Sequence, residues 1–227
     1  MQTPGNRLTF RSDGAEVVRA AIAADQLESL QSALAALPQD QAGVRLRDNK
    51  RLRPFLASSG PVGGVAATFL GLGCFPVRAI LFDKTAATNW SLAWHQDRTI
   101  AVAQRLEVEG FGPWTIKSGW HHVAPPADVL TGLITVRVHL DPVTASNAPL
   151  LIAPGSHLLG RISESQIDAV VARLGTVACL ADAGDVWVYS TPILHASEVA
   201  HEPSRRRVLQ VDYAIAELPG GLQWLGV

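Results

Sequence analysis

The sequence is poor in cysteine and its charges nearly cancel. Its two cysteines, Cys74 and Cys179, are too few for a disulfide framework or a thiolate metal site. Nineteen Lys and Arg residues against 20 Asp and Glu leave a net charge of −1, so no long-range field attracts nucleic acid or an anionic membrane. We therefore expect a protein of the reducing cytoplasm with neither nucleic acid nor a membrane as a partner.

Long uninterrupted apolar runs are also missing. The uncharged stretch that begins at Pro54 contains three prolines and five glycines by residue 77, which would leave backbone groups unpaired in lipid. It is interpreted as buried loop and short helix. The first ten residues lack a basic segment followed by an apolar run, so no secretory leader is expected.

What the chain does have is enough apolar material for one globular domain. It has 227 residues, of which 48% are hydrophobic and 17% charged. Residues 1–75 are predicted to form a mostly helical support, because apolar residues recur at helical spacing over 15–37 and Pro38 then ends the pattern. A basic cluster follows, and its members are Arg45, Arg47, Lys50, Arg51 and Arg53. It is interpreted as a solvated face, with a phosphate or carboxylate clamp as the alternative.

After Pro76 the chain is organised as short runs rich in Val, Ile, Thr and aromatic residues, separated by Gly, Pro, Asn and Asp. About eight such runs precede residue 217, the number typical of an antiparallel two-sheet barrel. The fold class is therefore mainly β, a double-stranded β-helix (jelly roll) over 76–216 with residues 217–227 as a tail. One helix interrupts the strands, beginning at a Ser163 to Gln166 capping box.

The motif His-x-Asp occurs twice, as His95-Gln96-Asp97 and as His139-Leu140-Asp141. Residues i and i+2 of a strand point to the same face, so either pair offers an imidazole and a carboxylate to one point. His195, at the end of a hydrophobic run, is the most plausible third ligand. Two histidines and one carboxylate leave coordination positions open, as an Fe(II) oxygenase requires, and no HExxH or paired CxxC motif indicates zinc.

The spacing to His195 favours the first pair. His195 lies 98 residues after Asp97, which leaves room for the intervening strands of a barrel, but only 54 residues after Asp141. The competing interpretation of the first pair is a strand-end histidine that hydrogen-bonds to a nearby aspartate.

Three blocks give the chain a resemblance to a known family: WHQD (94–97), NAPLLIAPGSH (147–157) and LHASEVAHEPSRRRVLQVDY (194–213). Together and in this order they resemble the phytanoyl-CoA dioxygenase family of Fe(II)- and 2-oxoglutarate-dependent oxygenases. The resemblance covers approximately residues 76–216, and the N-terminal segment contributes little to it.

The resemblance implies metal ligands, co-substrate contacts and a reaction. The metal ligands would be His95, Asp97 and His195, which also form the catalytic centre. An arginine eleven residues after the last histidine binds the distal carboxylate of 2-oxoglutarate, which selects Arg206, assisted by Ser197. Fe(II), 2-oxoglutarate and O₂ would together hydroxylate an unactivated carbon of a small-molecule substrate and release succinate and CO₂. Retention of Asp97 speaks against a halogenase.

Arg137 stands where some relatives carry an aromatic residue beside the co-substrate, and it shares one strand face with His139. If that face lines the barrel, these two side chains are candidates to bind a carboxylate; the alternative is the solvated side of an edge strand. Period-two alternation turns Arg206 and Asp212 inward, with Arg205 and Arg207 outward.

Further substrate candidates lie in and near a Gly- and Pro-rich excursion that we interpret as an active-site lid over 109–126. They are Trp114, Trp120 and His121, with Gln96 and Asp212 nearer to the metal; packing under the loop is the competing role for the tryptophans. Asn89 is a candidate co-substrate contact, and Lys84 is a weaker one.

The alternative function is a cupin-like barrel that binds a metal or a small ligand without 2-oxoglutarate turnover, in which Arg206 is an ordinary surface residue. A third hypothesis is a zinc hydrolase with the same three ligands. Because the chain has only three lysines, a small polar metabolite or amino acid derivative is favoured over a large anionic CoA ester.

Overall fold

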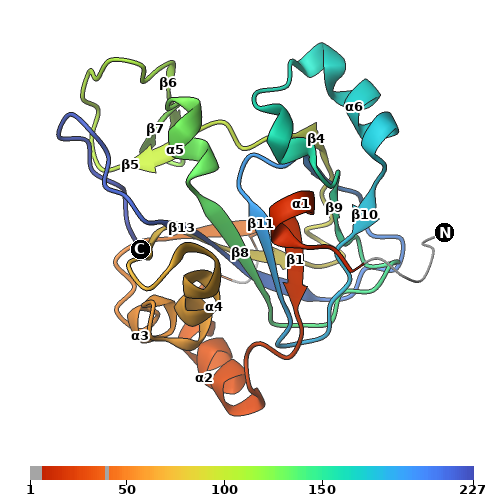
Figure 1. Ribbon diagram of the computed structural model, residues 1–227. Helices are drawn as coiled ribbons and strands as arrows, with labels where there is room; N and C mark the ends of the chain where they lie inside the picture. Colours follow the sequence, from red (N-terminus) through yellow and green to blue (C-terminus); the bar gives the residue numbers. More distant parts are fainter. Residues whose placement is uncertain (1–6, 39–40) are drawn as a thin grey trace.

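The computed structural model describes residues 7–38 and 41–227 (Figure 1). The expectation that no secretory leader is present rests partly on residues 1–6, which lie outside the described residues. The helices are α1 (Phe10–Asp13), α2 (Ala24–Leu34), α3 (Arg53–Leu56), α4 (Pro61–Leu70), α5 (Ala127–Thr131) and α6 (Ile167–Leu174), with 3₁₀ turns at Ser156–Leu159 and Glu164–Gln166.

The largest sheet has six strands, all paired antiparallel. In spatial order they are β1 (Ala15–Val18), β11 (Val186–Ser190), β8 (Ile134–His139), β13 (Arg206–Ala214), β3 (Phe75–Lys84) and β2 (Gly43–Leu46). A four-stranded sheet consists of β10 (Val177–Ala178), β9 (Leu150–Ile152), β12 (His195–Ser197) and β4 (Leu92–His95). A smaller third sheet contains β5 (Ile100–Val102), β7 (Trp120–Val123) and β6 (Trp114–Lys117).

From β8 to β13 the chain passes repeatedly between the two larger sheets, with β9 and β10 consecutive in the four-stranded one, and this connectivity makes the fold a jelly roll, as predicted. Each of the eight predicted runs contains a strand. The predicted helix after residue 162 is also present, although Ser163 contacts the side chain of Gln166 rather than capping a backbone N–H (3.0 Å between Oγ and Oε1).

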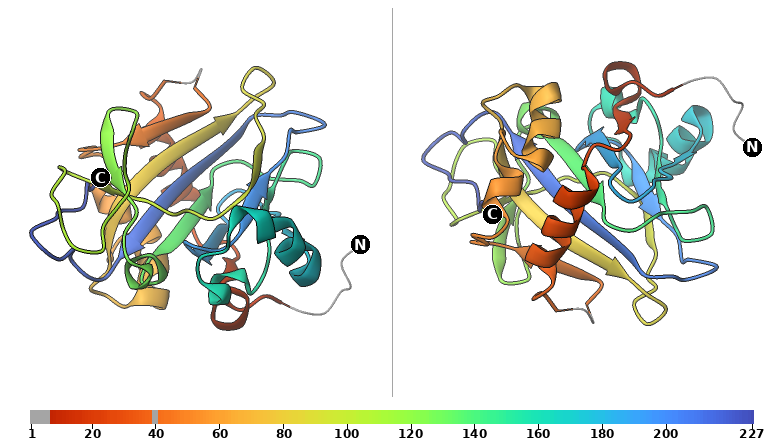
Figure 2. Two further views of the ribbon diagram at one scale, coloured as in Figure 1. Left: turned by 90° about the horizontal axis from the view of Figure 1, so that it is seen from above. Right: turned by 90° about the horizontal axis from the view of Figure 1, so that it is seen from below.

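The large sheet presents two chemically different faces. Val136, Val138, Leu209 and Val211 belong to a core that helices α2, α3 and α4 cover, and Figure 2 shows these helices lying across that face. The residues between them along the strands, such as Arg137 and Gln210, point to the other side, toward the four-stranded sheet. The helical layer thus seals one face, and the polar face lines the interior of the jelly roll.

Two local predictions from the sequence are wrong, the second of them only in part. Residues 15–18 form strand β1, because the β-branched Val17 and Val18 pair with the edge of β11, and the helix begins only at Ala24. The basic cluster is not wholly a solvated face, because Arg45 is half-buried in β2. Within the excursion interpreted as a lid, β6 and β7 pair as a hairpin, and its role as a lid stays a prediction.

The C-terminal residues pack on the third sheet. Leu218 and Leu222 are buried with Ile100 and Val123, and Trp224 forms a β-bridge with Val102. The division of the chain into support, core and tail stays a prediction. Among the described residues no helix is long and apolar enough to cross a membrane.

Candidate metal centre

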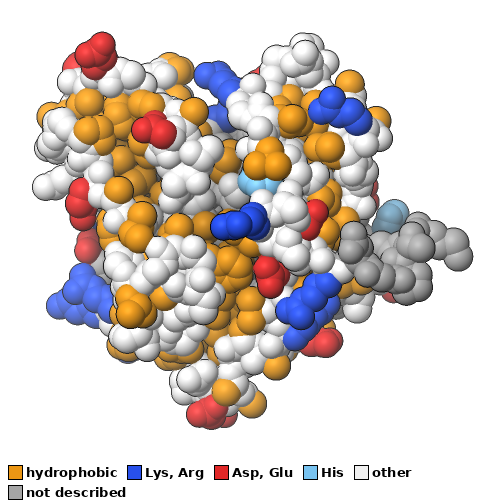
Figure 3. Space-filling view, in the orientation of Figure 1, with side chains coloured by type: hydrophobic (Ala, Val, Ile, Leu, Met, Phe, Trp, Pro, Cys, Tyr) orange, Lys and Arg blue, Asp and Glu red, His pale blue; other side chains and the backbone are white. Residues whose placement is uncertain are grey.

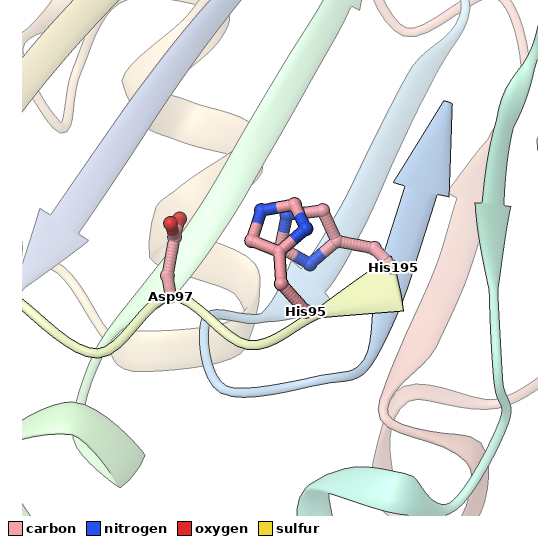
Figure 4. A group of neighbouring side chains, drawn as sticks. All are labelled: His95, Asp97 and His195. Atoms are coloured by element: carbon pink, nitrogen blue, oxygen red, sulfur yellow. The ribbon is translucent and has the colours of Figure 1, made fainter. Parts of the chain in front are cut away.

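His95, Asp97 and His195 converge at one point although the last is distant from the others along the chain (Figure 4). His95 ends β4 and His195 begins β12, and these two residues are direct partners in the antiparallel register of the two strands. Asp97 follows two residues after His95. One potential ligand atom from each residue lies within 4.8 Å of the others, and this is the one such group among the described residues.

Backbone carbonyls orient both imidazoles. The Nδ1 atom of His95 lies 2.8 Å from the Ala93 carbonyl oxygen, and that of His195 lies 2.9 Å from the Ile193 carbonyl oxygen. An Nδ1–H that donates to a carbonyl leaves Nε2 unprotonated and available to a metal ion. Burial lowers the pKa of His195 to about 4, so this imidazole is neutral at physiological pH.

Arg78 on β3 holds the carboxylate of Asp97. Its Nη2 donates to Asp97 Oδ2 at 3.0 Å, and its Nε donates to Asp212 Oδ2 at 2.5 Å. Burial alone would raise the pKa of Asp97, but the charge and hydrogen bond of Arg78, together with His195 and His95, lower the value to about 2. Asp212 also accepts a hydrogen bond from Thr135, so the candidate ligand is fixed by a polar network. Arg78 was not among the predicted residues, although it shares one face of β3 with Ile80 and Phe82, and this period of two was available as a signal.

The three residues border a cavity of about 240 Å³ between the two larger sheets. Its wall includes three predicted co-substrate residues, Arg206, Ser197 and Arg137, together with Gln210. Other lining side chains are Arg45, Arg78, Ile80, Phe82, Trp90, Leu92, Lys117 and Leu150. The wall is therefore strongly cationic, and Asp97 is its one carboxylate among the described residues.

Two buried guanidinium groups lie together in this cavity. Arg137 donates to Gln210 Oε1 at 2.6 Å, and Arg206 donates to the Ala148 carbonyl. The Nε atoms of both arginines and the Ser197 hydroxyl are buried without a hydrogen-bond partner. Burial, followed by the charge of Arg137, lowers the pKa of Arg206 to about 10. Unsatisfied buried donors of this kind fit a carboxylate that enters the cavity.

Several other predicted contacts lie outside this cavity wall. Asn89 uses its amide to bridge to the backbone of Ala200, at 2.8 and 3.1 Å. Gln96 binds the Gly160 and Pro192 carbonyls and the Ile162 N–H, and so fixes two loops. Its carboxamide thus has backbone partners for both its oxygen and its nitrogen.

The aromatic residues of the hairpin and the second His-x-Asp motif are also elsewhere. Trp114 packs in the core beneath the third sheet, while Trp120 and His121 are half-buried in β7 and do not line the cavity. His139 is buried on the same strand face as Arg137 but does not reach the cavity wall, and Asp141 pairs with Arg207 at 2.7 Å. Asp212 contacts Arg78 and Thr135 instead of the cavity.

Asp97 and Gln96 also border a second, more apolar cavity of about 170 Å³. Its walls come from α5 and the residues before it, and from the turn at 157–161. Figure 3 shows the molecule hollowed between the lobe that carries β5–β7 and the lobe that carries α6, with basic side chains at the rim. Of the three candidate metal ligands, Asp97 therefore borders this cavity as well.

A jelly roll with two imidazoles and one carboxylate at its interior is the architecture of non-haem iron oxygenases. The family model described as phytanoyl-CoA dioxygenase (PhyH) matches residues 10–208, which is most of the chain. The chain belongs to this family, which confirms the resemblance found in the sequence. No curated protein sequence matches the chain.

Solved structures show the same fold at low sequence identity. Apo EctD from S. alaskensis has a TM-score of 0.69 at 20% identity, over 100% of this chain and 84% of its own. HygX from Streptomyces hygroscopicus, with nickel and 2-oxoglutarate bound, has a TM-score of 0.61 at 13% identity, over 90% of this chain and 84% of its own. The epimerase SnoN, in complex with Fe³⁺, alpha ketoglutarate and nogalamycin RO, has a TM-score of 0.63 at 16% identity, over 93% of this chain and 88% of its own.

Proposed function

We propose that the chain is an Fe(II)- and 2-oxoglutarate-dependent dioxygenase that hydroxylates an unactivated carbon of a small-molecule substrate. One observation carries the proposal: the His95–Asp97–His195 cluster and the buried, unsatisfied guanidinium of Arg206 line the same cavity. A cation-binding triad and a carboxylate-binding group are the two features that a chelating keto acid requires. Structures of this fold with iron or nickel and with 2-oxoglutarate bound support it.

The donor set fits a ferrous ion. His95 and His195 would bind it through Nε2, and Asp97 through the oxygen that Arg78 leaves free, because Arg78 donates to Oδ2. With 2-oxoglutarate and O₂, the bound iron supplies the oxidising power of the reaction. Three protein ligands leave open the positions that these two co-substrates need.

The protein's own contribution is positioning. Arg206 would hold the distal carboxylate of 2-oxoglutarate by charge-assisted hydrogen bonds, with Ser197 and Arg137 donating to the same group. These donors are buried and already oriented by Ala148 and Gln210, so little reorganisation is needed on binding. Helices α2–α4 close the outer face of the large sheet, which helps to exclude water from this side.

Anaerobic titration with Fe(II) and then 2-oxoglutarate tests the proposal. We expect a visible charge-transfer band in the wild-type protein and none in His195→Ala. In air, succinate should form. A substrate that increases succinate formation should yield a product heavier by the mass of one oxygen atom. A product of unchanged or reduced mass would replace hydroxylation by epimerisation, desaturation or ring closure.

The competing function is a metal or small-ligand binder without turnover. It predicts metal binding with neither a charge-transfer band nor succinate. Activity that persists with Zn(II) and without oxygen would instead indicate a hydrolase.

A further inference from the structure

The cavity wall contains two further cations at a distance from Arg206. They are Arg45 of β2 and Lys117 of β6. In the register of β13 and β3, Arg206 lies opposite Lys84, and Asp212 lies opposite Arg78. The Arg206 end of the cavity wall is therefore six residues from the Arg78 end on each strand. Arg45 of β2 is the partner of Ile80, toward the Arg78 end. Lys117 ends β6, next to the hairpin turn. Both side chains line the cavity close to the candidate metal centre.

Neither cation has a carboxylate within salt-bridge distance in the part of the chain that the structure describes, although exposed arginines such as Arg105 and Arg205 do. Arg45 Nη1 donates to the hydroxyl of Ser118 at 2.7 Å, and Lys117 Nζ donates to the hydroxyl of Thr99 at 3.1 Å. Both acceptors are neutral. The Nε atom of Arg45 is buried and has no hydrogen-bond partner within residues 7–38 and 41–227.

The protein balances the positive charges of this region only in part. Three cations, Arg45, Arg78 and Lys117, face two carboxylates, Asp97 and Asp212, and both carboxylates contact Arg78. Burial, followed by the charge of Arg78, lowers the pKa of Arg45, and burial also lowers the pKa of Lys117 against the opposing charge of Asp97. Holding like charges together in a partly desolvated site is unfavourable unless an anion enters. Arg45 still has an unpaired edge, and a planar carboxylate matches that edge with two hydrogen bonds.

We propose that Arg45 and Lys117 bind a carboxylate of the primary substrate and thereby place a neighbouring carbon over the metal centre. The inference rests on the proposed function, in which Arg206, Ser197 and Arg137 hold the co-substrate. The hydroxyls of Ser118 and Thr99 hold the two cations in place from the hairpin and from the loop before β5. Trp90, Phe82 and Leu92 supply the apolar wall for the uncharged part of a small substrate.

A panel of matched ligands tests this inference by binding rather than by turnover. The probes are N-acetyl amino acids and other small carboxylic acids, each with its primary amide, and phosphate monoesters with their parent alcohols. Binding is measured by saturation-transfer NMR on the wild-type protein loaded with Zn(II) and saturating 2-oxoglutarate. We expect the best acids to bind at least about tenfold more tightly than their amides, because a charge-assisted pair is lost in the amide.

Variants assign the preference to the two residues. Arg45→Gln and Lys117→Met should each reduce the acid-to-amide preference to about threefold or less, whereas Arg45→Lys should restore part of it. The matched control is Arg51→Gln, an exposed arginine of the same basic cluster that lies outside the cavity and should retain the full preference. Thermal unfolding verifies that each variant is folded.

Amides that bind as well as acids, a panel in which no acid binds, or a preference retained in both variants would overturn the inference. Phosphate monoesters that bind more tightly than every acid would replace the carboxylate by a phosphate. The charge-transfer band of the wild-type protein separates this outcome from the parent proposal. A band without acid preference refutes only the anion site, and acid preference without a band refutes only the oxygenase.

Discussion

Three consecutive arginines meet three different environments at the start of β13. Arg206 is buried in the cavity, Arg205 pairs with Asp83 at 2.8 Å, and Arg207 pairs with Asp141 at 2.7 Å. The difference arises because neighbouring side chains of a strand point to opposite faces. The inward orientation of Arg206 agrees with the alternation argued from the sequence, while its role as a co-substrate ligand stays a prediction.

Replacing Arg206 by Gln should raise the KM for 2-oxoglutarate by about 10- to 100-fold, because charged hydrogen bonds of about 1.5–3 kcal/mol are lost. Succinate formation at varied 2-oxoglutarate measures the effect. Arg205→Gln is the matched control and should change KM by less than about twofold, because Arg205 pairs with Asp83 and does not line the cavity. Equal KM values for Arg206→Gln and wild type would contradict the assignment.

His139 provides a prediction about pH. Burial, followed by the charges of Arg137 and Arg206, lowers its pKa to about 3, and both ring nitrogens lack a partner. Below pH 6.5 the unfolded chain binds a proton at this residue that the folded chain does not. The free energy of unfolding therefore falls as pH decreases, by up to about 1.4 kcal/mol per unit from this group.

His139→Leu removes this contribution. Denaturant unfolding of the metal-free proteins between pH 7 and pH 4.5 should show a shallower loss of stability in the variant than in wild type. All other ionisable groups are the same in both proteins, so their contributions cancel in the comparison. Parallel pH profiles would contradict the prediction.

At the scale of elements, the helical layer positions the sheet whose other face carries the site. Leu30 of α2 is fully buried in the core between helices and sheet, whereas Leu72, after α4, is 82% exposed. Leu30→Ala should lower the free energy of unfolding by about 2–5 kcal/mol, through lost burial and the cavity left behind.

Leu72→Ala removes the same atoms from an exposed position and should change stability by less than about 0.5 kcal/mol. Urea unfolding of both variants measures the difference. Similar losses in the two variants would mean that the helices do not form the cover that the structure assigns to them.

At the scale of the whole molecule, the candidate metal centre joins segments that are far apart in the sequence. A metal ion that binds only the folded chain stabilises it by about 2.7 kcal/mol at a concentration 100 times Kd. For a chain of this size, anaerobic Fe(II) should therefore raise Tm by about 5–10 °C. Scanning calorimetry measures the shift.

His195→Ala should abolish this increase, while His201→Ala should retain it, because His201 is exposed and lies outside the cluster. An increase of equal size in His195→Ala would indicate that the metal ion binds elsewhere.

The sequence by itself was sufficient for the fold class and the family, and both are confirmed. In a strand that alternates apolar and polar residues, the pattern indicates which side chains share a face, because a side-chain period of two is a local property of extended backbone. For the same reason His95 and Asp97, two residues apart, were recognisable as a pair. His195 and Arg206 were found through the ordered family blocks rather than through any local rule.

Only the tertiary structure decided which distant segments meet. Arg45 belongs to a short edge strand whose side chains reach the cavity through pairing with β3, and no local pattern separates it from the solvent-facing arginines beside it. Residues 15–18 become a strand because an edge of β11 is available to them. Pairing partners and buried charges depend on contacts between remote residues, so the sequence could determine the sheet and the candidate ligands but not the cationic wall around them.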